Sequence, residues 1–272
     1  MKFPGTTVAV KAIWAISCLS LMGAAAFNNA DAQSCKNRSP AYTVALLELY
    51  TSEGCDSCPP AEKFISGFRA IPVNADAMTA DEVVPLSFHV DYWDDLGWRD
   101  VFAKNAFTLR QRWLSGLASS RTVYTPEFFL QGKESRAWLH QISAAVKFIN
   151  TKPAQADIDI ATGRVIDGRL QVNVNASAMQ NGKLYVVLYE NAIRSDVGAG
   201  ENSGVTLLHD YTVRDWAEQK LSPDYHGHNT TYLSYNFVVP ASLTIENLGV
   251  AAFVQTDRGE VLQALALPLC GS

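Results

Sequence analysis

The sequence predicts an α/β domain followed by an antiparallel β-sandwich domain. Between residues 43 and 149, apolar runs typical of buried strands alternate with segments of helical spacing, and this order favours a mostly parallel sheet covered by helices. After residues 151–153, the apolar pattern changes to a period of two, with glycine-containing turns between the repeats. We therefore predict domains at residues 33–151 and 152–272, after a signal peptide at residues 1–32.

The first 32 residues have the pattern of an export signal. Lys2 and Lys11 give a positive start, residues 12–27 are apolar, and Ala30-Asp-Ala32 is a small-x-small cleavage site that places the mature N-terminus at Gln33. A membrane anchor is the alternative, but the stretch is short and ends in small and polar residues. We therefore expect a periplasmic or secreted protein that has no membrane partner after signal removal.

The composition narrows the class of partner. The chain has a formal net charge of −5 and no basic run, so nucleic acid and anionic membrane surfaces are poor partners. A glycine-rich stretch at residues 198–204 lacks the Lys-Ser/Thr ending of a phosphate loop. We predict no cofactor from the sequence. We expect this stretch to pack against the first domain.

The first half is predicted to alternate strand and helix. Residues 43–50 are apolar throughout, as in a strand buried on both faces. Pro85 indicates an edge strand or a strand start, because proline cannot donate a hydrogen bond to a sheet. The expected strands are 43–50, 83–90 and 123–130, and the expected helices are 59–69, 100–116 and 136–149.

The second half is predicted to consist of strands, with one helical exception at residues 213–220. Asp167-Gly168, Asn181-Gly182 and Arg258-Gly259 are expected turns. The expected strands are 157–160, 170–175, 184–189, 232–237, 249–254 and 261–266.

Four cysteines follow the signal segment. Proximity favours a Cys55–Cys58 disulfide, which leaves Cys35 to pair with Cys270. The second bridge would be structural and would close a very long loop, for which the chain-entropy model gives at most roughly 5 kcal/mol. The alternative is two loose chain ends whose thiols are idle or intermolecular.

Cys55-Asp-Ser-Cys58 lies where a predicted strand gives way to a helix. A helix N-terminus stabilises a thiolate, so we predict that Cys55 is the nucleophile and that Cys58 resolves the mixed disulfide. Asp56 disfavours a thiolate on Cys55 through its negative charge. A small structural disulfide and half of a zinc site are the alternatives, although zinc would need two further ligands.

Two resemblances extend this interpretation. The first domain resembles the thioredoxin-like fold in its strand, its Cys55-x-x-Cys58 helix start and its later Thr125-Pro126, followed by Gly132. That resemblance implies a cis-proline at Pro126, facing the disulfide, with Thr125 in a substrate groove. The whole mature chain resembles the DUF1223 family of secreted proteins, whose name implies no activity. The residues that carry this resemblance are 48–62 (ELYTSEGCDSCPPAE), 88–98 (FHVDYWDDLGW), 124–126 (YTP) and 200–204 (GENSG), with His209.

Further candidates surround the cysteine pair. Glu48, in the first strand, is a candidate proton acceptor behind Cys58, whereas Glu53 is expected to be a solvated turn residue. Trp93 and Trp98 follow the second strand and are candidate substrate platforms, because strand carboxyl ends face the ligand crevice in open α/β sheets. The same segment is alternatively a cation site or a loop that caps a helix and plugs the domain interface. The cation site would use His89 with Asp91, Asp94 and Asp95.

The remaining imidazoles give a weaker signal. His226-Gly-His228 beside Asp224 offers a copper or zinc pair, although such residues more often lie in an exposed loop. His209 is a further isolated imidazole.

These observations together predict an exported thiol–disulfide oxidoreductase-like protein that acts on protein thiols and disulfides. Its predicted catalytic residues are Cys55, Cys58, Pro126 and Glu48. One alternative is a copper or other metal carrier that uses Cys55, Cys58 and a histidine such as His89. The other is a binding module with an inert disulfide.

Overall fold

A computed structural model describes residues 1–2, 5, 35–69, 81–120 and 122–270. Residues Met1–Asp31 separate from Ala32–Ser272 as a distinct unit, and the architecture below is that of the second unit. The predicted signal peptide and its cleavage site lie outside the described residues, apart from positions 1, 2 and 5. Within the described part, no helix is long and apolar enough to cross a membrane.

Three α-helices and fifteen strands are present in the described ranges. The helices are α1 (Pro59–Ser66), α2 (Asn105–Leu117) and α3 (Trp138–Asn150), and short 3-10 turns lie at Gly67–Arg69, Asp91–Trp93 and Ile245–Asn247. The strands are β1 (Cys35–Arg38), β2 (Ala45–Thr51), β3 (Val83–His89), β4 (Glu127–Leu130), β5 (Lys133–Glu134), β6 (Ala156–Ile166), β7 (Arg169–Ala178), β8 (Lys183–Glu190), β9 (Ile193–Asp196), β10 (Thr206–His209), β11 (Thr212–Lys220), β12 (Ser222–Pro223), β13 (Asn229–Val238), β14 (Leu248–Gln255) and β15 (Val261–Pro268).

One eight-stranded mixed sheet organises the fold, in the order β15-β14-β8-β11-β3-β2-β4-β5. Its parallel pairs are β2 with β3 and β3 with β11, and its other pairs are antiparallel. A second sheet, β1-β6-β7-β13-β12, is antiparallel throughout. Strands from both halves of the chain therefore share one sheet.

The predicted fold class is wrong. The protein is mostly β-sheet, organised around one large mixed sheet, and it is not an α/β thioredoxin-like domain followed by a sandwich. The segment predicted as a helix at 213–220 is instead strand β11, which pairs with β8 along its whole length and meets β3 at Thr212 and Ser87. This pairing joins the early strands to the late ones in one large sheet.

Pro85 fits into β3 although β3 has neighbours on both sides. Ser87 donates its N–H to the carbonyl of Tyr211, so the odd-numbered residues of β3 direct their N–H groups toward β11. Pairing with β11 is at Ser87, two residues after Pro85. The missing N–H of Pro85 therefore lies before the point at which β11 joins, so Pro85 is not at a strand start but on a side of β3 that is unpaired there.

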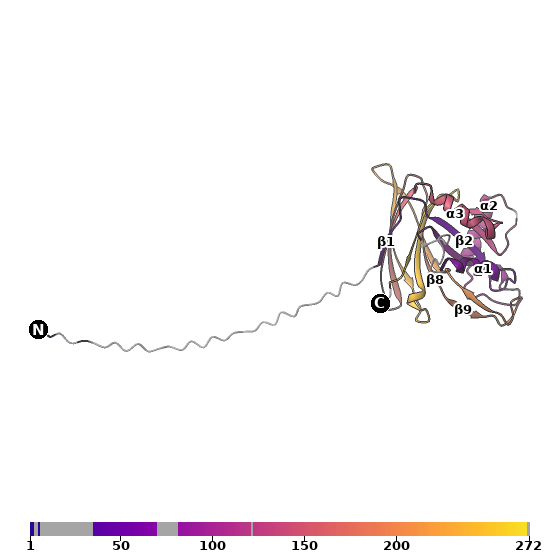
Figure 1. The fold of residues 1–272 in the computed structure, drawn as a ribbon, viewed down its shortest axis with the longest axis horizontal. Helices are drawn as coiled ribbons and strands as arrows, with labels where there is room; N and C mark the ends of the chain where they lie inside the picture. Colours follow the sequence, from indigo (N-terminus) through magenta and orange to yellow (C-terminus); the bar gives the residue numbers. More distant parts are fainter. Residues whose placement is uncertain (3–4, 6–34, 70–80, 121, 271–272) are drawn as a thin grey trace. The chain divides into compact units, whose positions relative to one another are not determined.

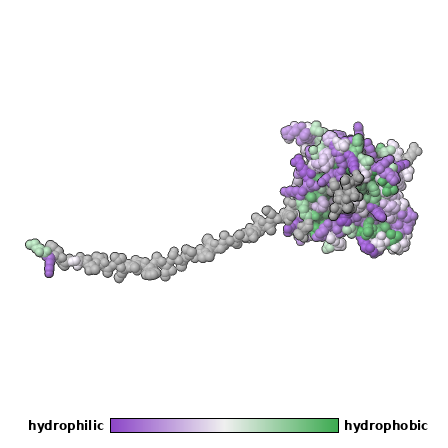
Figure 2. All heavy atoms as spheres, viewed as in Figure 1, coloured by the Kyte–Doolittle hydropathy of each residue, from purple (hydrophilic) through white to green (hydrophobic). Residues whose placement is uncertain are grey.

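Alternate side chains of the large sheet point into hydrophobic cores on its two faces. One face packs against the five-stranded sheet over β8, β14 and β15, and against α1 and α3 over β2 and β4. The other face packs against α2. Figure 1 shows the helices beside β2, with β1 and its sheet on the far side, and Figure 2 shows polar and apolar residues interspersed over the face in view.

The six strands predicted in the second half are confirmed within β6, β7, β8, β13, β14 and β15. A further hairpin, β9–β10, was not predicted. It forms a two-stranded sheet of its own, and β10 contacts α1. This hairpin carries residues from the second half of the chain to the cysteine pair.

Candidate functional site

Cys55 and Cys58 form a disulfide directly before α1. Cys58 is the N-cap of this helix, and Pro59 and Pro60 occupy the first turn, where a missing N–H costs nothing. The N–H groups of Ala61 and Glu62 donate to the Cys58 carbonyl. The Ser57 hydroxyl lies 3.4 Å from the Cys55 sulfur, so it is placed to donate to a thiolate there. Both cysteines are fully buried.

Cys35 and Cys270 form the second disulfide, as the cysteine count predicts. Cys35 begins β1 and is buried, and Cys270 follows β15. The bridge joins the two ends of the described unit across 235 residues. It ties the start of β1, in the five-stranded sheet, to the residues after β15, in the eight-stranded sheet.

A loop from the β9–β10 hairpin holds the backbone of the cysteine turn. The Asn202 amide donates to the carbonyls of Glu53 and Cys55, at 2.8 and 2.9 Å, and the Asp56 N–H donates to the Glu201 carboxylate. Gly200 has φ +73°, and a Cβ there would lie 3.0 Å from the Trp98 Cβ, so glycine suits this approach. The expectation that this glycine-rich stretch packs against the first half of the chain is confirmed.

A buried cluster of carboxylates and imidazoles lies beneath the turn. His209, at the end of β10, sits between Glu53 and Glu62, with its Nε2 3.2 Å from Glu53 Oε1 and its Nδ1 in contact with Glu62 Oε2. Burial alone would lower the pKa of His209, but the charges and hydrogen bonds of Glu62 and Glu53 outweigh it and raise that pKa to about 10. The protonated, positively charged form of His209 is therefore favoured at neutral pH.

His89 ends β3 and points into the same cluster. Its Nδ1 lies 2.6 Å from Asp100 Oδ2, which also accepts the Glu53 N–H. Burial would raise the pKa of Asp100, but the His89 charge and hydrogen bonds from His89, Glu53 and Phe102 outweigh it and lower that pKa. The His89 and His209 ring centroids are 5.1 Å apart. The cluster is thus continuous from Asp100 to Glu62.

Glu53 differs from its expected state. We expected a solvated turn residue, yet Glu53 is completely buried. Trp98 donates its indole N–H to Glu53 Oε2 at 2.7 Å, and His209 occupies the other oxygen. Burial opposes its charged form, but these hydrogen bonds, with one from Ser195, keep the pKa of Glu53 below its ordinary value.

The predicted substrate residues also gather at the turn. Trp93 donates its indole N–H to the Thr125 hydroxyl at 2.8 Å, and its Cβ lies 3.3 Å from where a Gly54 side chain would begin. The peptide bond between Thr125 and Pro126 is cis, as the resemblance implied. Trp93, Trp98, Thr125 and Pro126 are all partly buried.

Glu48 does not lie beside the cysteine pair. Alternation along β2 directs Leu47 and Leu49 toward α1, and Glu48 toward α2. Both Glu48 oxygens accept hydrogen bonds from Arg110, at 2.7 and 2.8 Å. The structure therefore does not bring Glu48 together with the cysteines. Arg110 also lines a cavity of about 480 Å³ on that side of the sheet.

The other metal-ligand candidates make ordinary turn contacts. Asp91 accepts the Thr108 hydroxyl, and Asp94 accepts the Asp100 N–H. Asp224 accepts the backbone N–H groups of residues 226 and 228, both exposed. Glu62 and Asp100 were not singled out from the sequence. Glu62 had a local signal, because it follows Cys58 by one helical turn, whereas Asp100 had none.

The described residues thus define a β-rich protein with a buried disulfide over a buried carboxylate–imidazole cluster. The chain belongs to the DUF1223 family, described as a protein of unknown function, and the match covers residues 46–255. This confirms the family resemblance. Comparison with curated proteins finds no match.

Two solved structures share the fold. One is protein AGR_C_4864 from Agrobacterium tumefaciens, at 23% identity and a TM-score of 0.56, covering 86% of this chain and 98% of that one. The other is HBP35 of Porphyromonas gingivalis, at 15% identity and a TM-score of 0.60, covering 85% of this chain and 76% of that one. At these identities, the likeness extends to the fold alone.

Proposed function

We propose that the Cys55–Cys58 disulfide opens and closes reversibly, and that the protein is a thiol–disulfide oxidoreductase acting on protein thiols. The observation that carries this proposal is the position of the pair, which closes directly onto the N-cap of α1. A helix N-terminus favours negative charge, and the Ser57 hydroxyl adds a donor at the Cys55 sulfur. Both effects stabilise a thiolate in the reduced protein.

The proposed exchange conserves electrons and protons. The Cys55 thiolate attacks one sulfur of a client disulfide, and the other client sulfur leaves as a thiolate. Cys58 then attacks Cys55, which forms the Cys55–Cys58 disulfide and releases the first client sulfur. The client gains two electrons, the cysteine pair loses two, and the two protons of the dithiol end on the client thiols. The reverse sequence oxidises a client dithiol.

Access to the disulfide is part of the proposal. Both sulfurs are buried, and Asn202 ties the cysteine turn to the β9–β10 loop. A client therefore reaches Cys55 only when this loop moves. Trp93 and Trp98 lie against Gly54 and Glu53 of the turn, Thr125 accepts a hydrogen bond from Trp93, and these three residues supply the proposed client contacts.

The first experiment is the equilibrium redox potential of the pair, measured by alkylation after poising in glutathione buffers. We expect a value between about −120 and −270 mV, the range of known exchangers. A value below about −300 mV is typical of structural disulfides and would contradict the proposal. A Cys55→Ser variant should lose exchange with a disulfide-bonded client, and unchanged turnover in that variant would also count against it.

The proposed location is the periplasm or the exterior. Two disulfides support an oxidising compartment, as does the export pattern of the first 32 residues. Cell fractionation with N-terminal sequencing tests this, with Gln33 as the expected first residue. A cytoplasmic protein that retains Met1 would contradict it.

A further inference from the structure

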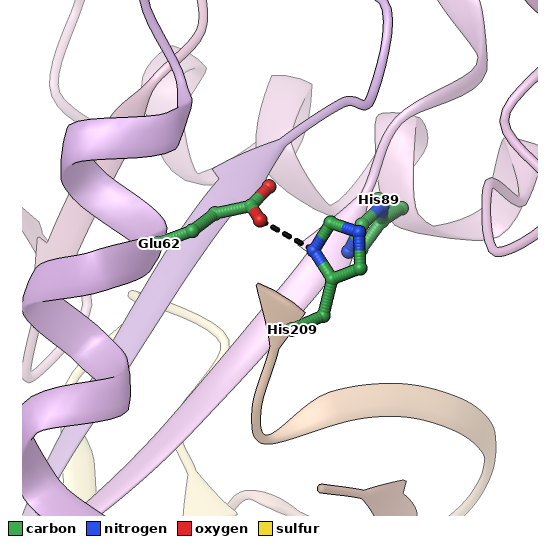
Figure 3. A group of neighbouring side chains, drawn as sticks. All are labelled: Glu62, His89 and His209. Carbon is green, nitrogen blue, oxygen red and sulfur yellow. Dashed lines mark ion pairs between the residues drawn. The ribbon is translucent and has the colours of Figure 1, made fainter. Parts of the chain in front are cut away.

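Three potential metal-ligand atoms converge inside the cluster. Glu62 Oε2, His89 Nε2 and His209 Nδ1 are buried; His89 Nε2 has no polar partner, and the Glu62 and His209 atoms contact each other as an ion pair. One ligand atom from each residue lies within 4.8 Å of the others. Figure 3 shows Glu62 reaching from α1 toward His209, with His89 beside it. A buried polar atom without a partner, such as His89 Nε2, is rare and calls for an explanation.

Each of these side chains is held through its other polar atom. His89 Nδ1 lies 2.6 Å from Asp100 Oδ2, His209 Nε2 lies 3.2 Å from Glu53 Oε1, and Glu62 Oε1 accepts the Thr51 hydroxyl at 2.7 Å. When each imidazole donates only to its carboxylate, a lone pair is left on His89 Nε2 and on His209 Nδ1, so a metal ion would displace the proton that His209 Nδ1 shares with Glu62. Carboxylates that orient imidazoles in this way are typical of metal sites.

We propose that Glu62, His89 and His209 bind a divalent transition-metal ion, and that Zn²⁺ fits this donor set. Two imidazole nitrogens and one carboxylate oxygen suit zinc and its neighbours, whereas Mg²⁺ and Ca²⁺ prefer oxygen ligands throughout. Three protein ligands leave a fourth coordination position for water or another small ligand. The ligands come from α1, β3 and β10, so the ion would join both halves of the chain.

This site uses no sulfur, and it therefore differs from a carrier that binds metal through Cys55 and Cys58. It predicts binding while the disulfide is intact. It is also independent of the proposed exchange, because replacing both cysteines by serine should abolish exchange and preserve zinc binding. Loss of zinc binding in that double variant would overturn the proposal.

The test begins with the oxidised, chelator-treated protein at neutral pH. Zn²⁺ is added in competition with a chromophoric chelator after long equilibration, because the site is buried, and Co²⁺ is used as a spectroscopic probe. We expect one equivalent per chain, a Co²⁺ spectrum without thiolate charge-transfer bands, and a higher Tm with Zn²⁺. An absence of stoichiometric binding, or binding only after reduction, would overturn the proposal and leave a proton-bridged cluster.

Matched variants locate the ion. Glu62→Gln keeps the shape and the hydrogen bond to Thr51, and it should weaken Zn²⁺ binding by at least about tenfold. His226→Gln removes an exposed imidazole from the His-x-His loop and should change nothing. The opposite pattern would place the ion on that loop and overturn the proposal. Circular dichroism checks folding, and if Glu62→Gln misfolds, His89→Gln is the second variant, for which the same loss is expected and retained affinity would be contrary.

Discussion

Asn202 donates a 2.9 Å hydrogen bond to the carbonyl of Cys55, across a sequence separation of 147 residues. The same amide donates to the carbonyl of Glu53, and Asn202 itself is buried. One side chain of the β9–β10 loop therefore fixes the backbone on both sides of Gly54. We therefore expect opening of the disulfide to depend on movement of this loop.

We predict that Asn202→Ala speeds reduction of the Cys55–Cys58 disulfide by a small phosphine. The variant leaves the carbonyl of Glu53 without a donor and removes one of the two donors to the carbonyl of Cys55, which keeps the Cys58 N–H. This should lower the free energy of unfolding by about 1–3 kcal/mol and loosen the cover over the sulfurs. The measurement is the rate of thiol release under native conditions, together with urea unfolding.

Ser203→Ala is the matched control. Ser203 lies in the same loop, is exposed, and bonds only within it, to the carbonyl of Gly198. Its reduction rate should equal that of the wild type. Equal rates in the Asn202 variant as well would show that the loop does not govern access.

Two neighbours of Cys55 should change its reactivity in opposite directions. Ser57→Ala removes the hydroxyl 3.4 Å from the Cys55 sulfur and should slow alkylation of the reduced protein several-fold at neutral pH. Asp56→Asn removes an adjacent negative charge and should speed it. Alkylation kinetics followed by mass spectrometry distinguish the two cysteines. Changes of the same sign would argue against thiolate stabilisation as the cause.

The sequence predicts the strands well but not their partners. The run 184–189 and the run 249–254 were predicted and lie in β8 and β14. Residues 213–220 contain Ala217, Glu218, Gln219 and Lys220, good helix formers, yet antiparallel pairing with β8 makes them a strand. Helix propensity contributes less free energy than pairing with an available sheet edge. The sequence analysis therefore missed the mixed sheet, and for that reason it predicted the wrong fold class.

The candidate site was likewise predicted only in its local features. The Cys-x-x-Cys spacing and the helix start are local, so they were predicted. His209 meets Glu53 across 156 residues, and no local pattern indicates that contact. The hairpin that delivers His209 and Asn202 depends on the topology, which the periodicity of a single chain does not encode.

Arg110 and Glu48 form a buried pair whose two halves depend on each other. The guanidinium binds both Glu48 oxygens and Gln255, and both charged side chains are almost completely buried. Arg110→Met should cost about 3–5 kcal/mol, because it leaves a buried carboxylate unpaired. Adding Glu48→Leu should recover much of that loss. Guanidinium chloride unfolding of both variants tests this, and a nearly neutral single variant would disprove it.

Glu127, directly after the cis-proline, should make stability depend on pH near neutrality. Burial raises its pKa from 4.5 to about 7, although hydrogen bonds from Gln111 and Ser115 partly oppose the shift. The folded state therefore holds a proton that the unfolded state has lost between these two values. The contribution of this proton is complete below about pH 4.5 and is lost as the pH rises through about 7.

For such a shift, the free energy of unfolding should fall by on the order of 3 kcal/mol between these two pH values. His209, with its pKa raised to about 10, adds a decline of the same sign at higher pH, so the wild type alone does not isolate Glu127. Glu127→Gln should flatten the profile between pH 4.5 and 7, while Glu246→Gln, at an exposed glutamate, should not. Urea unfolding across this range is the measurement. A slope that persists in Glu127→Gln would mean that another group carries the proton.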